Sequence, residues 1–256
     1  MDQIAATLPK TSHADLQTSN LLRALSSQDA ELIRPIAQAW HGELGATLFE
    51  PGETIRYVYF PCGPSMISYL VAMDDGRLIE TALIGREGAA GGIVSQGRLP
   101  AYAKAEVQFP GPFLRIAIKE LEEAKSKSVT LRHLFTRYAD CLIAQIFQAV
   151  ACNAAHTIEQ RTAKWLIAAI ERTGSMELSL TQEHLAVMLG VGRSYISRVI
   201  ASMKRRGLIV TRRSMLVVRD LDELRAVACA CNDCVRRHFD DVLRGVYPGE
   251  DEIEGA

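Results

Sequence analysis

Apolar residues recur at helical spacing in the last third of the chain, in two short groups. Residues 185–189 give one apolar face and residues 196–203 give a second one. Thr181 precedes the first group and can cap a helix with its hydroxyl, and Gly190 follows that group, where a C-cap needs left-handed backbone. The pattern predicts two helices joined by a tight turn.

Two short β-like runs follow these helices. They extend from Leu208 to Val210 and from Leu216 to Val218, with Arg212 and Arg213 between them. Two helices, a turn and a small hairpin are the parts of a winged helix-turn-helix, with the two arginines on the wing. We therefore expect this motif from Leu178 to Arg219.

Short β-rich runs separated by Gly, Pro and Asp turns fill residues 44–118. Asp75-Gly76 between two such runs is a typical hairpin signal. Closely spaced strands of this kind predict a sandwich or barrel. Two short helices, Asn20 to Leu25 and Ser27 to Ala39, are expected before it.

Helical spacing returns after the β-rich segment. A short helix is expected from Lys119 to Lys125 and a long one from about Val129 to Ala154. The long helix has an apolar seam with alternating spacings of four and three residues, formed by Leu131, Phe135, Tyr138, Leu142, Gln145, Ala149 and Cys152. This seam predicts a dimer interface, and the alternative is a helix packed on its own β-domain. Further helices are expected from Thr157 to Arg172 and from Asp220 to about Leu243.

The elements together predict an α+β protein with an N-terminal β-roll of jelly-roll type, a long helix and a C-terminal winged helix-turn-helix. The expected units are a flexible tail at 1–20, the β-roll sensor domain at 21–125, the dimerisation helix at 126–156, the DNA-binding domain with a C-terminal helix at 157–245, and an acidic tail at 246–256.

Charge separates the winged motif from the rest of the chain. Residues 191–219 contain eight basic side chains and no acidic one, whereas the whole chain has a net charge of -1. A local positive surface on a nearly neutral protein indicates a polyanion such as double-stranded DNA. We expect bases to be read by Arg193, Ser194, Tyr195, Ser197 and Arg198, and phosphates to be bound by Thr181, Gln182, Lys204, Arg212 and Arg213.

Composition excludes several classes of protein. Hydrophobic residues make up 48% of the chain and charged residues 23%, and no apolar run reaches membrane-spanning length. The N-terminus lacks the pattern of a secretory signal, and the six cysteines form no disulfide-like framework, so we expect a cytoplasmic protein. No enzyme is expected, because residues 44–118 contain no histidine for a cupin-type metal site and no catalytic motif occurs.

Several motifs resemble those of the family of the cyclic-AMP receptor protein and the fumarate–nitrate reduction regulator (CRP/FNR). They are EPGE at 50–53, VYFP at 58–61, DGR at 75–77, IGREG at 84–88, ACN at 151–153 and TQEHLAVMLGVGR at 181–193. The resemblance implies a cyclic-nucleotide-binding-like β-roll and a homodimer, formed through the helix at 129–154, that regulates transcription at a palindromic promoter site. The partners that it implies are DNA, a second copy and RNA polymerase. The IGREG motif resembles a branch whose members mostly lack a known effector.

The sequence departs from the cyclic-nucleotide binders of this family. Glu87 is followed by Gly88-Ala89-Ala90, and residues 98–101 lack the Arg-Ser pair that holds the phosphate, so a cyclic nucleotide is not expected. The turn Gly85-Arg86-Glu87-Gly88 is the candidate site for a small anionic or hydroxylated effector. The alternatives are a simple β-turn and a regulator that needs no effector. Ser194 replaces the family's glutamate, so the DNA site should differ.

The cysteines suggest a second kind of sensor. No cysteine precedes Cys62, so the N-terminal iron–sulfur ligand set of some family members is missing. Cys229, Cys231, Cys234 and His238 have the spacing C-x-C-x2-C-x3-H, which is compatible with a metal site or a thiol switch. Against this, residues 229 and 231 face different ways on a straight helix.

Overall fold

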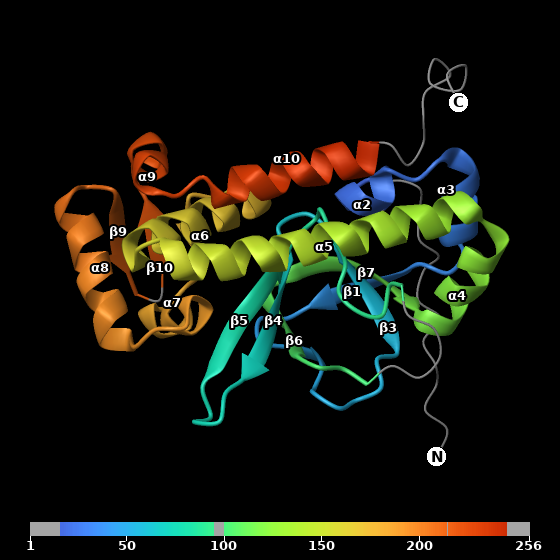
Figure 1. The fold of residues 1–256 in the computed structure, drawn as a ribbon, viewed down its shortest axis with the longest axis horizontal. Helices are drawn as coiled ribbons and strands as arrows, with labels where there is room; N and C mark the ends of the chain where they lie inside the picture. The colour runs from blue at the N-terminus through green and yellow to red at the C-terminus, as the bar shows by residue number, and fades with distance from the viewer. Residues whose placement is uncertain (1–15, 95–99, 214, 245–256) are drawn as a thin grey trace.

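The computed structural model describes residues 16–94, 100–213 and 215–244, so most of the expected N-terminal tail and the whole acidic tail lie outside it. The α+β class and the order β-domain, long helix and helix-turn-helix are confirmed (Figure 1). Among the described helices, none has the length and apolar character that crossing a bilayer requires.

Two antiparallel sheets form the N-terminal domain. One has the order β1-β7-β3 and the other β2-β6-β4-β5. Apolar side chains from both sheets, including Phe49, Ile67 and Phe113, meet in one core between them. The strands are β1 (Gln38–Gly42), β2 (Thr47–Phe49), β3 (Tyr57–Pro61), β4 (Met66–Ala72), β5 (Leu78–Ile84), β6 (Lys104–Phe109) and β7 (Gly111–Ala117).

Two short helices precede the sheets, α2 (Asn20–Arg23) and α3 (Ser27–Ile33). The prediction that helix continues from Ser27 to Ala39 is wrong. Pro35 has no amide hydrogen to continue the helix, and the chain enters β1 at Gln38, where it pairs with β7.

The long helix α5 (Val129–Ala155) begins at Ser128, whose hydroxyl accepts a hydrogen bond from the Leu131 amide and donates to the Asp29 carboxylate. The short α4 (Ile118–Lys127) leads into it from β7. Asp29 is 1% exposed and also accepts from Thr130, so it fixes the start of α5 against α3.

The apolar seam predicted for the dimer is covered by its own chain. Leu131, Phe135 and Tyr138 are fully buried, and the Gln145 side chain donates to the backbone carbonyl of Leu83 on β5. The alternative, a helix packed on its own β-domain, therefore describes this face. A different face of α5 is exposed, and its large apolar members are Ile143, Ile146, Phe147 and Val150.

The C-terminal domain has the expected winged helix-turn-helix form. Its elements are α6 (Ile158–Thr173), β8 (Glu177–Leu178), α7 (Gln182–Leu189), α8 (Arg193–Arg205), β9 (Ile209–Arg212) and β10 (Met215–Val218). The strands form a small sheet of order β8-β10-β9, of which β8 was missed because it is only two residues long. Trp165, Ile196 and Leu216 belong to one core that holds these elements together.

The single last helix predicted from Asp220 to Leu243 is wrong. The chain forms α9 (Leu221–Val227), breaks at residues 228–230 and continues as α10 (Cys231–Arg244). Helix α10 then runs back along α5 towards the β-domain (Figure 1). There Phe239 lies 6.3 Å from the Tyr138 ring, and Arg137 donates to the Val242 carbonyl.

Candidate DNA-binding surface

The helix-turn-helix is fixed at both ends of its first helix. The Thr181 hydroxyl accepts from the His184 amide at 3.1 Å, as expected for an N-cap. Gly190 ends α7 with φ 65°, which a residue with a side chain adopts only with strain. Gly192 then caps α8, so the two helices are separated by a short turn.

Helix α8 buries one face and exposes the other. Ile196, Val199, Ile200 and Met203 are buried in the domain core. Arg193, Ser194, Tyr195 and Arg198, all predicted base readers, are exposed. The Arg198 guanidinium lies 5.1 Å from the centre of the Tyr195 ring, a cation–π contact that holds both side chains on the outer face.

Ser197 is placed differently from the other predicted base readers. It is half-buried, and its hydroxyl donates to the Gln182 side chain at 2.8 Å and lies 3.0 Å from the Arg193 carbonyl. Ser197 therefore positions Gln182, a predicted phosphate ligand, at the start of α7.

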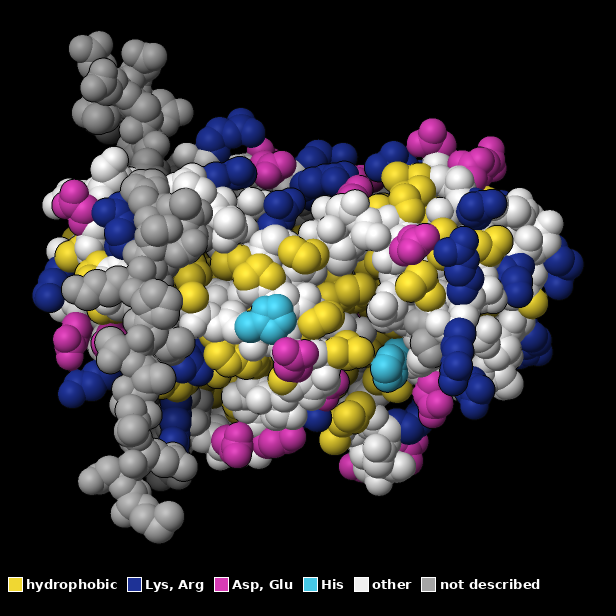
Figure 2. Space-filling model, turned by 180° about the vertical axis from the view of Figure 1, so that it is seen from behind, with side chains coloured by type: hydrophobic (Ala, Val, Ile, Leu, Met, Phe, Trp, Pro, Cys, Tyr) yellow, Lys and Arg dark blue, Asp and Glu magenta, His cyan; other side chains and the backbone are white. Residues whose placement is uncertain are grey.

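The predicted phosphate ligands surround α8. Lys204 is exposed and donates to Thr211 on β9 at 3.1 Å, and Arg212 pairs with Glu177 at 3.6 Å. Arg213 is exposed at the wing turn. Figure 2 shows Lys and Arg side chains over the end of the molecule that holds this domain. The surface offers several cations around one exposed helix, which suits the phosphates on both sides of a DNA groove.

Comparison with known proteins identifies the family of the C-terminal domain. The model of the Crp-like helix-turn-helix domain matches residues 160–227, from α6 to the end of α9. The chain carries a Crp-like helix-turn-helix domain. The comparison with curated proteins found no match.

Solved structures resemble the described chain well beyond the Crp-like domain. FixK2 of Bradyrhizobium japonicum is 16% identical, with a TM-score of 0.63, covering 76% of this chain and 98% of its own. TTHB099, a transcriptional regulator of the CRP family from Thermus thermophilus, is 19% identical, with a TM-score of 0.63 and coverage of 74% and 96%. The c-di-GMP-responsive regulator CLP of Xanthomonas campestris is 14% identical, with a TM-score of 0.60 and coverage of 76% and 100%. The fold is therefore that of CRP/FNR regulators.

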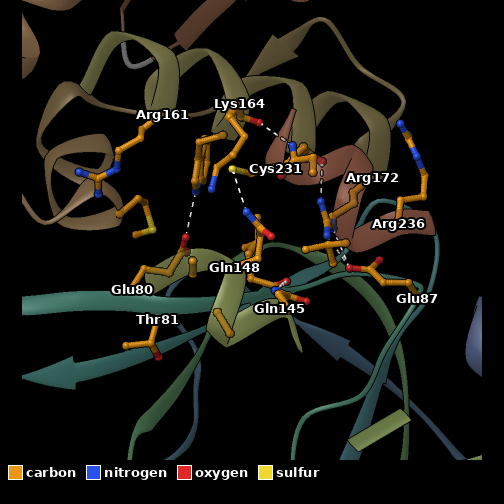
Figure 3. A pocket seen from close by; sticks show the side chains of 18 of the residues that line it. Glu80, Thr81, Glu87, Gln145, Gln148, Arg161, Lys164, Arg172, Cys231 and Arg236 are labelled. Atoms are coloured by element: carbon orange, nitrogen blue, oxygen red, sulfur yellow. Dashed lines mark hydrogen bonds and ion pairs between the residues drawn. The ribbon is translucent and has the colours of Figure 1, made fainter. Parts of the chain in front are cut away.

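A cavity of about 550 Å³ lies between the β-domain and the Crp-like domain. It is lined from β5, the turn that follows it, α5, α6, α7 and α10, and Figure 3 shows the charged side chains that meet there. Arg161, Lys164 and Arg172 line it from α6, and Glu80 lines it from β5.

The predicted effector turn borders this cavity, and Arg86 and Glu87 line it. The Glu87 carboxylate accepts from the Gly85 amide at 3.1 Å and forms an ion pair with Arg172 of α6 at 2.7 Å (Figure 3). The turn thus links the β-domain to the Crp-like domain.

Gly85 and Gly88 were expected to provide backbone with positive φ in the turn. Neither of them has a positive φ. A Cβ on Gly85 would lie 2.7 Å from the Arg172 side chain, and one on Gly88 would lie 2.5 Å from the Tyr138 hydroxyl. They allow these side chains of the same chain to approach closely. Arg98 and Leu99, part of the segment compared with the nucleotide binders, lie outside the described residues.

Glu80 is an acid held inside the same interface. Its carboxylate accepts from Ser68 at 2.5 Å and from the indole nitrogen of Trp165 at 2.9 Å. Burial raises the pKa of Glu80 to about 7, although these two hydrogen bonds and the charges of Lys164 and Arg172 act in the opposite direction.

The predicted metal ligands divide into two pairs. Cys229 and Cys231 are buried together, whereas Cys234 and His238 are exposed on α10. Cys152, near the end of α5, joins the buried pair. Sequence reasoning missed it because it lies 77 positions from Cys229. The available signal was its place in the ACN motif, beside the end of the long helix.

Proposed function

We propose that this protein is a homodimeric transcription regulator that binds a palindromic promoter site in the cytoplasm. The observation that carries the proposal is the exposed face of α8, on which Arg193, Tyr195 and Arg198 stand free of the domain core. A helix of this kind reads base edges from the major groove, while the cations around it bind phosphates. RNA polymerase is the further partner that this function implies.

Dimer formation is supported by the exposed face of α5. Phe147 is 70% exposed and Val150 is 65% exposed, and Ile143 and Ile146 extend the same stripe. Residues 143–155 contain no charged side chain. A contiguous apolar helix face is the mark of a protein interface, and a second copy of α5 matches it by two-fold symmetry. Such a dimer would present two α8 helices to two half-sites.

Regulation by a small anionic or hydroxylated metabolite is the second part of the proposal. The cavity volume of about 550 Å³ suits a small molecule, and Arg86, Arg161 and Arg172 offer it cations. A ligand there contacts both domains, so it can favour one arrangement of them over another and thereby change DNA affinity.

Arg198→Ala tests the DNA-binding proposal. Loss of a base contact should weaken binding to the selected site by about 1–3 kcal/mol and relax the preference at that base. Binding-site selection and titration at fixed salt would measure both. The wing variant Arg212→Ala is the matched control. It should weaken binding to all DNA sequences alike and make the affinity less dependent on salt concentration. If Arg198→Ala kept the base preference of the parent, α8 would not be the helix that recognises the bases.

Glu87→Ala tests the effector proposal. The change removes the partner of Arg172 and one polar wall of the cavity. Metabolites that raise the melting temperature of the parent should lose this effect in the variant, while DNA binding without effector persists. A metabolite that stabilises both proteins equally binds elsewhere.

A further inference from the structure

Three cysteines and a histidine converge at the point where α5 ends. Cys152 lies in the last turn of α5, and His156 is its C-cap. Cys229 lies in the link between α9 and α10, and Cys231 is the first residue of α10. One ligand atom of each residue lies within 4.8 Å of those of all the others. These four residues are called the junction cluster below.

Two distances within the cluster match those of a tetrahedral metal site, and no two of its ligand atoms are more than 4.8 Å apart. Cys152 Sγ and Cys229 Sγ are 3.6 Å apart, and Cys231 Sγ and His156 Nδ1 are also 3.6 Å apart. In a zinc site with Zn–S of about 2.3 Å and Zn–N of about 2.0–2.1 Å, tetrahedral angles separate two sulfurs by about 3.8 Å and a sulfur from a nitrogen by about 3.6 Å. The geometry points to the junction cluster as a Cys₃His site for Zn²⁺.

The backbone explains why distant residues meet here. His156 ends α5 in an extended conformation, with φ -112° and ψ 146°. Ala228 is also extended, Cys229 and Ala230 are not helical, and α10 begins only at Cys231. Cys229 lies before the helix and Cys231 in its first turn, so helical spacing does not set their relative directions, and their side chains lie together with that of Cys152. The objection that these two residues diverge on a straight helix therefore does not apply.

The surroundings suit a structural metal site. Cys152, Cys229 and Cys231 are at most 9% exposed, so three polarisable sulfurs are held together largely away from bulk solvent. Gln148 donates to Cys231 Sγ at 3.2 Å (Figure 3), as residues around a metal centre commonly do. Arg161 interacts electrostatically with Cys152 and Cys229, and its charge offsets the excess negative charge of three thiolates on one Zn²⁺. A disulfide between Cys152 and Cys229 would use only two of the four groups.

The junction cluster brackets the Crp-like domain. His156 lies two residues before α6, where that domain begins, and Cys229 lies two residues after α9, where it ends. A metal bound by all four residues would join both ends of the domain to the end of α5. Occupancy would then fix the direction in which α8 is presented to DNA, so the site would make DNA binding metal-dependent.

Metal titration of the purified full-length protein tests the site directly. Reduced, metal-free protein should bind one Zn²⁺ per chain. With Co²⁺ as the probe it should show thiolate-to-cobalt charge transfer and the intense ligand-field bands of a tetrahedral site. Binding at much less than one metal per chain, or bands of an octahedral cobalt site, would overturn the proposal. A thiol titration of protein purified without reductant that finds two thiols fewer than after reduction would show a disulfide in its place.

Variants assign the ligands. Cys152→Ser and His156→Ala should each lose stoichiometric tight binding, and His156 is partly exposed, so its replacement leaves the buried core intact. Cys234→Ser and His238→Ala are matched controls on α10, the helix that begins with Cys231, and should bind metal like the parent. Equal binding by Cys152→Ser, or loss of binding in Cys234→Ser, would contradict the assignment to the junction cluster.

Measurements of DNA affinity test whether metal binding at the junction cluster affects DNA binding, independently of whether the metal binds there. Removal of the metal with a chelator should weaken binding to the selected DNA at least tenfold, and Zn²⁺ should restore it. Unchanged affinity of a protein shown to have lost its metal would overturn the coupling. The metal stoichiometry does not depend on DNA, so the site can be confirmed even if the proposed regulator function is refuted.

Discussion

Replacement of Phe147 by aspartate is expected to turn the dimer into a monomer. The Phe147 side chain is 70% exposed on the apolar stripe of α5, and in the proposed dimer it lies near the two-fold axis. A carboxylate there would be buried without a partner, at a cost of about 3–5 kcal/mol. The dimer dissociation constant should rise more than about a hundredfold. Light scattering coupled to gel filtration would report the change, together with loss of binding to the paired half-sites.

Two further substitutions make this experiment decisive. Met73→Asp places the same charge on an exposed apolar side chain at the β4–β5 hairpin, so the dimer should persist. Leu142→Asp, on the seam predicted from the sequence, places the charge against the β-domain core, and it should lower the melting temperature of the chain. A dimeric Phe147→Asp protein would mean that the stripe is not the interface.

Glu80→Gln is expected to change how stability depends on pH. The unfolded chain releases the Glu80 proton near the ordinary pKa of 4.5, whereas the folded chain keeps it up to about 7. The unfolded state therefore binds fewer protons in this window. Raising the pH through it lowers the free energy of unfolding of the parent, by up to roughly 3 kcal/mol, with no further change from this group above pH 7.

Glutamine lacks this titration and keeps an oxygen that can accept from Trp165. The stability of Glu80→Gln relative to the parent should therefore increase between about pH 4.5 and pH 7 and then stay constant. Urea unfolding at a series of pH values would measure the difference. Glu31→Gln, on the exposed side of α3, is the control and should show no such trend. A constant difference between Glu80→Gln and parent would mean that the carboxyl ionises normally in the folded protein.

The sequence predicts best what depends on neighbouring residues. Helical spacing, the Thr181 cap and Gly190 locate α7 and α8 closely, because caps and turns are local. The spacing along α5 identifies apolar positions but cannot distinguish a face covered by the same chain from one covered by a second copy. That is why Leu142 was placed in the dimer seam although it packs on its own β-domain.

The features that the sequence did not predict depend on tertiary contacts. The helical pattern of residues 220–243 gives no sign of the break before Cys231, yet this break brings Cys229 to Cys152. The Gly85–Gly88 turn was singled out from its residues and borders the cavity, but the contact of its Glu87 with Arg172 joins positions 85 residues apart. Such pairings follow from the packing of complete domains and leave no periodic signal in the sequence.

The return of α10 to the β-domain has a consequence for how the protein is made. Phe239 completes the core that contains Tyr138, Leu21 and Phe60, so the N-terminal domain includes a residue from near the end of the chain. A ribosome that adds about 5–20 residues per second needs roughly 5–20 s to travel from Tyr138 to Phe239. During that time the apolar surface around Tyr138 lacks its cover while the Crp-like domain is being synthesised. The N-terminal half of the nascent chain therefore stays incomplete until its last helix is made, and a chain truncated after α9 would leave that surface permanently exposed.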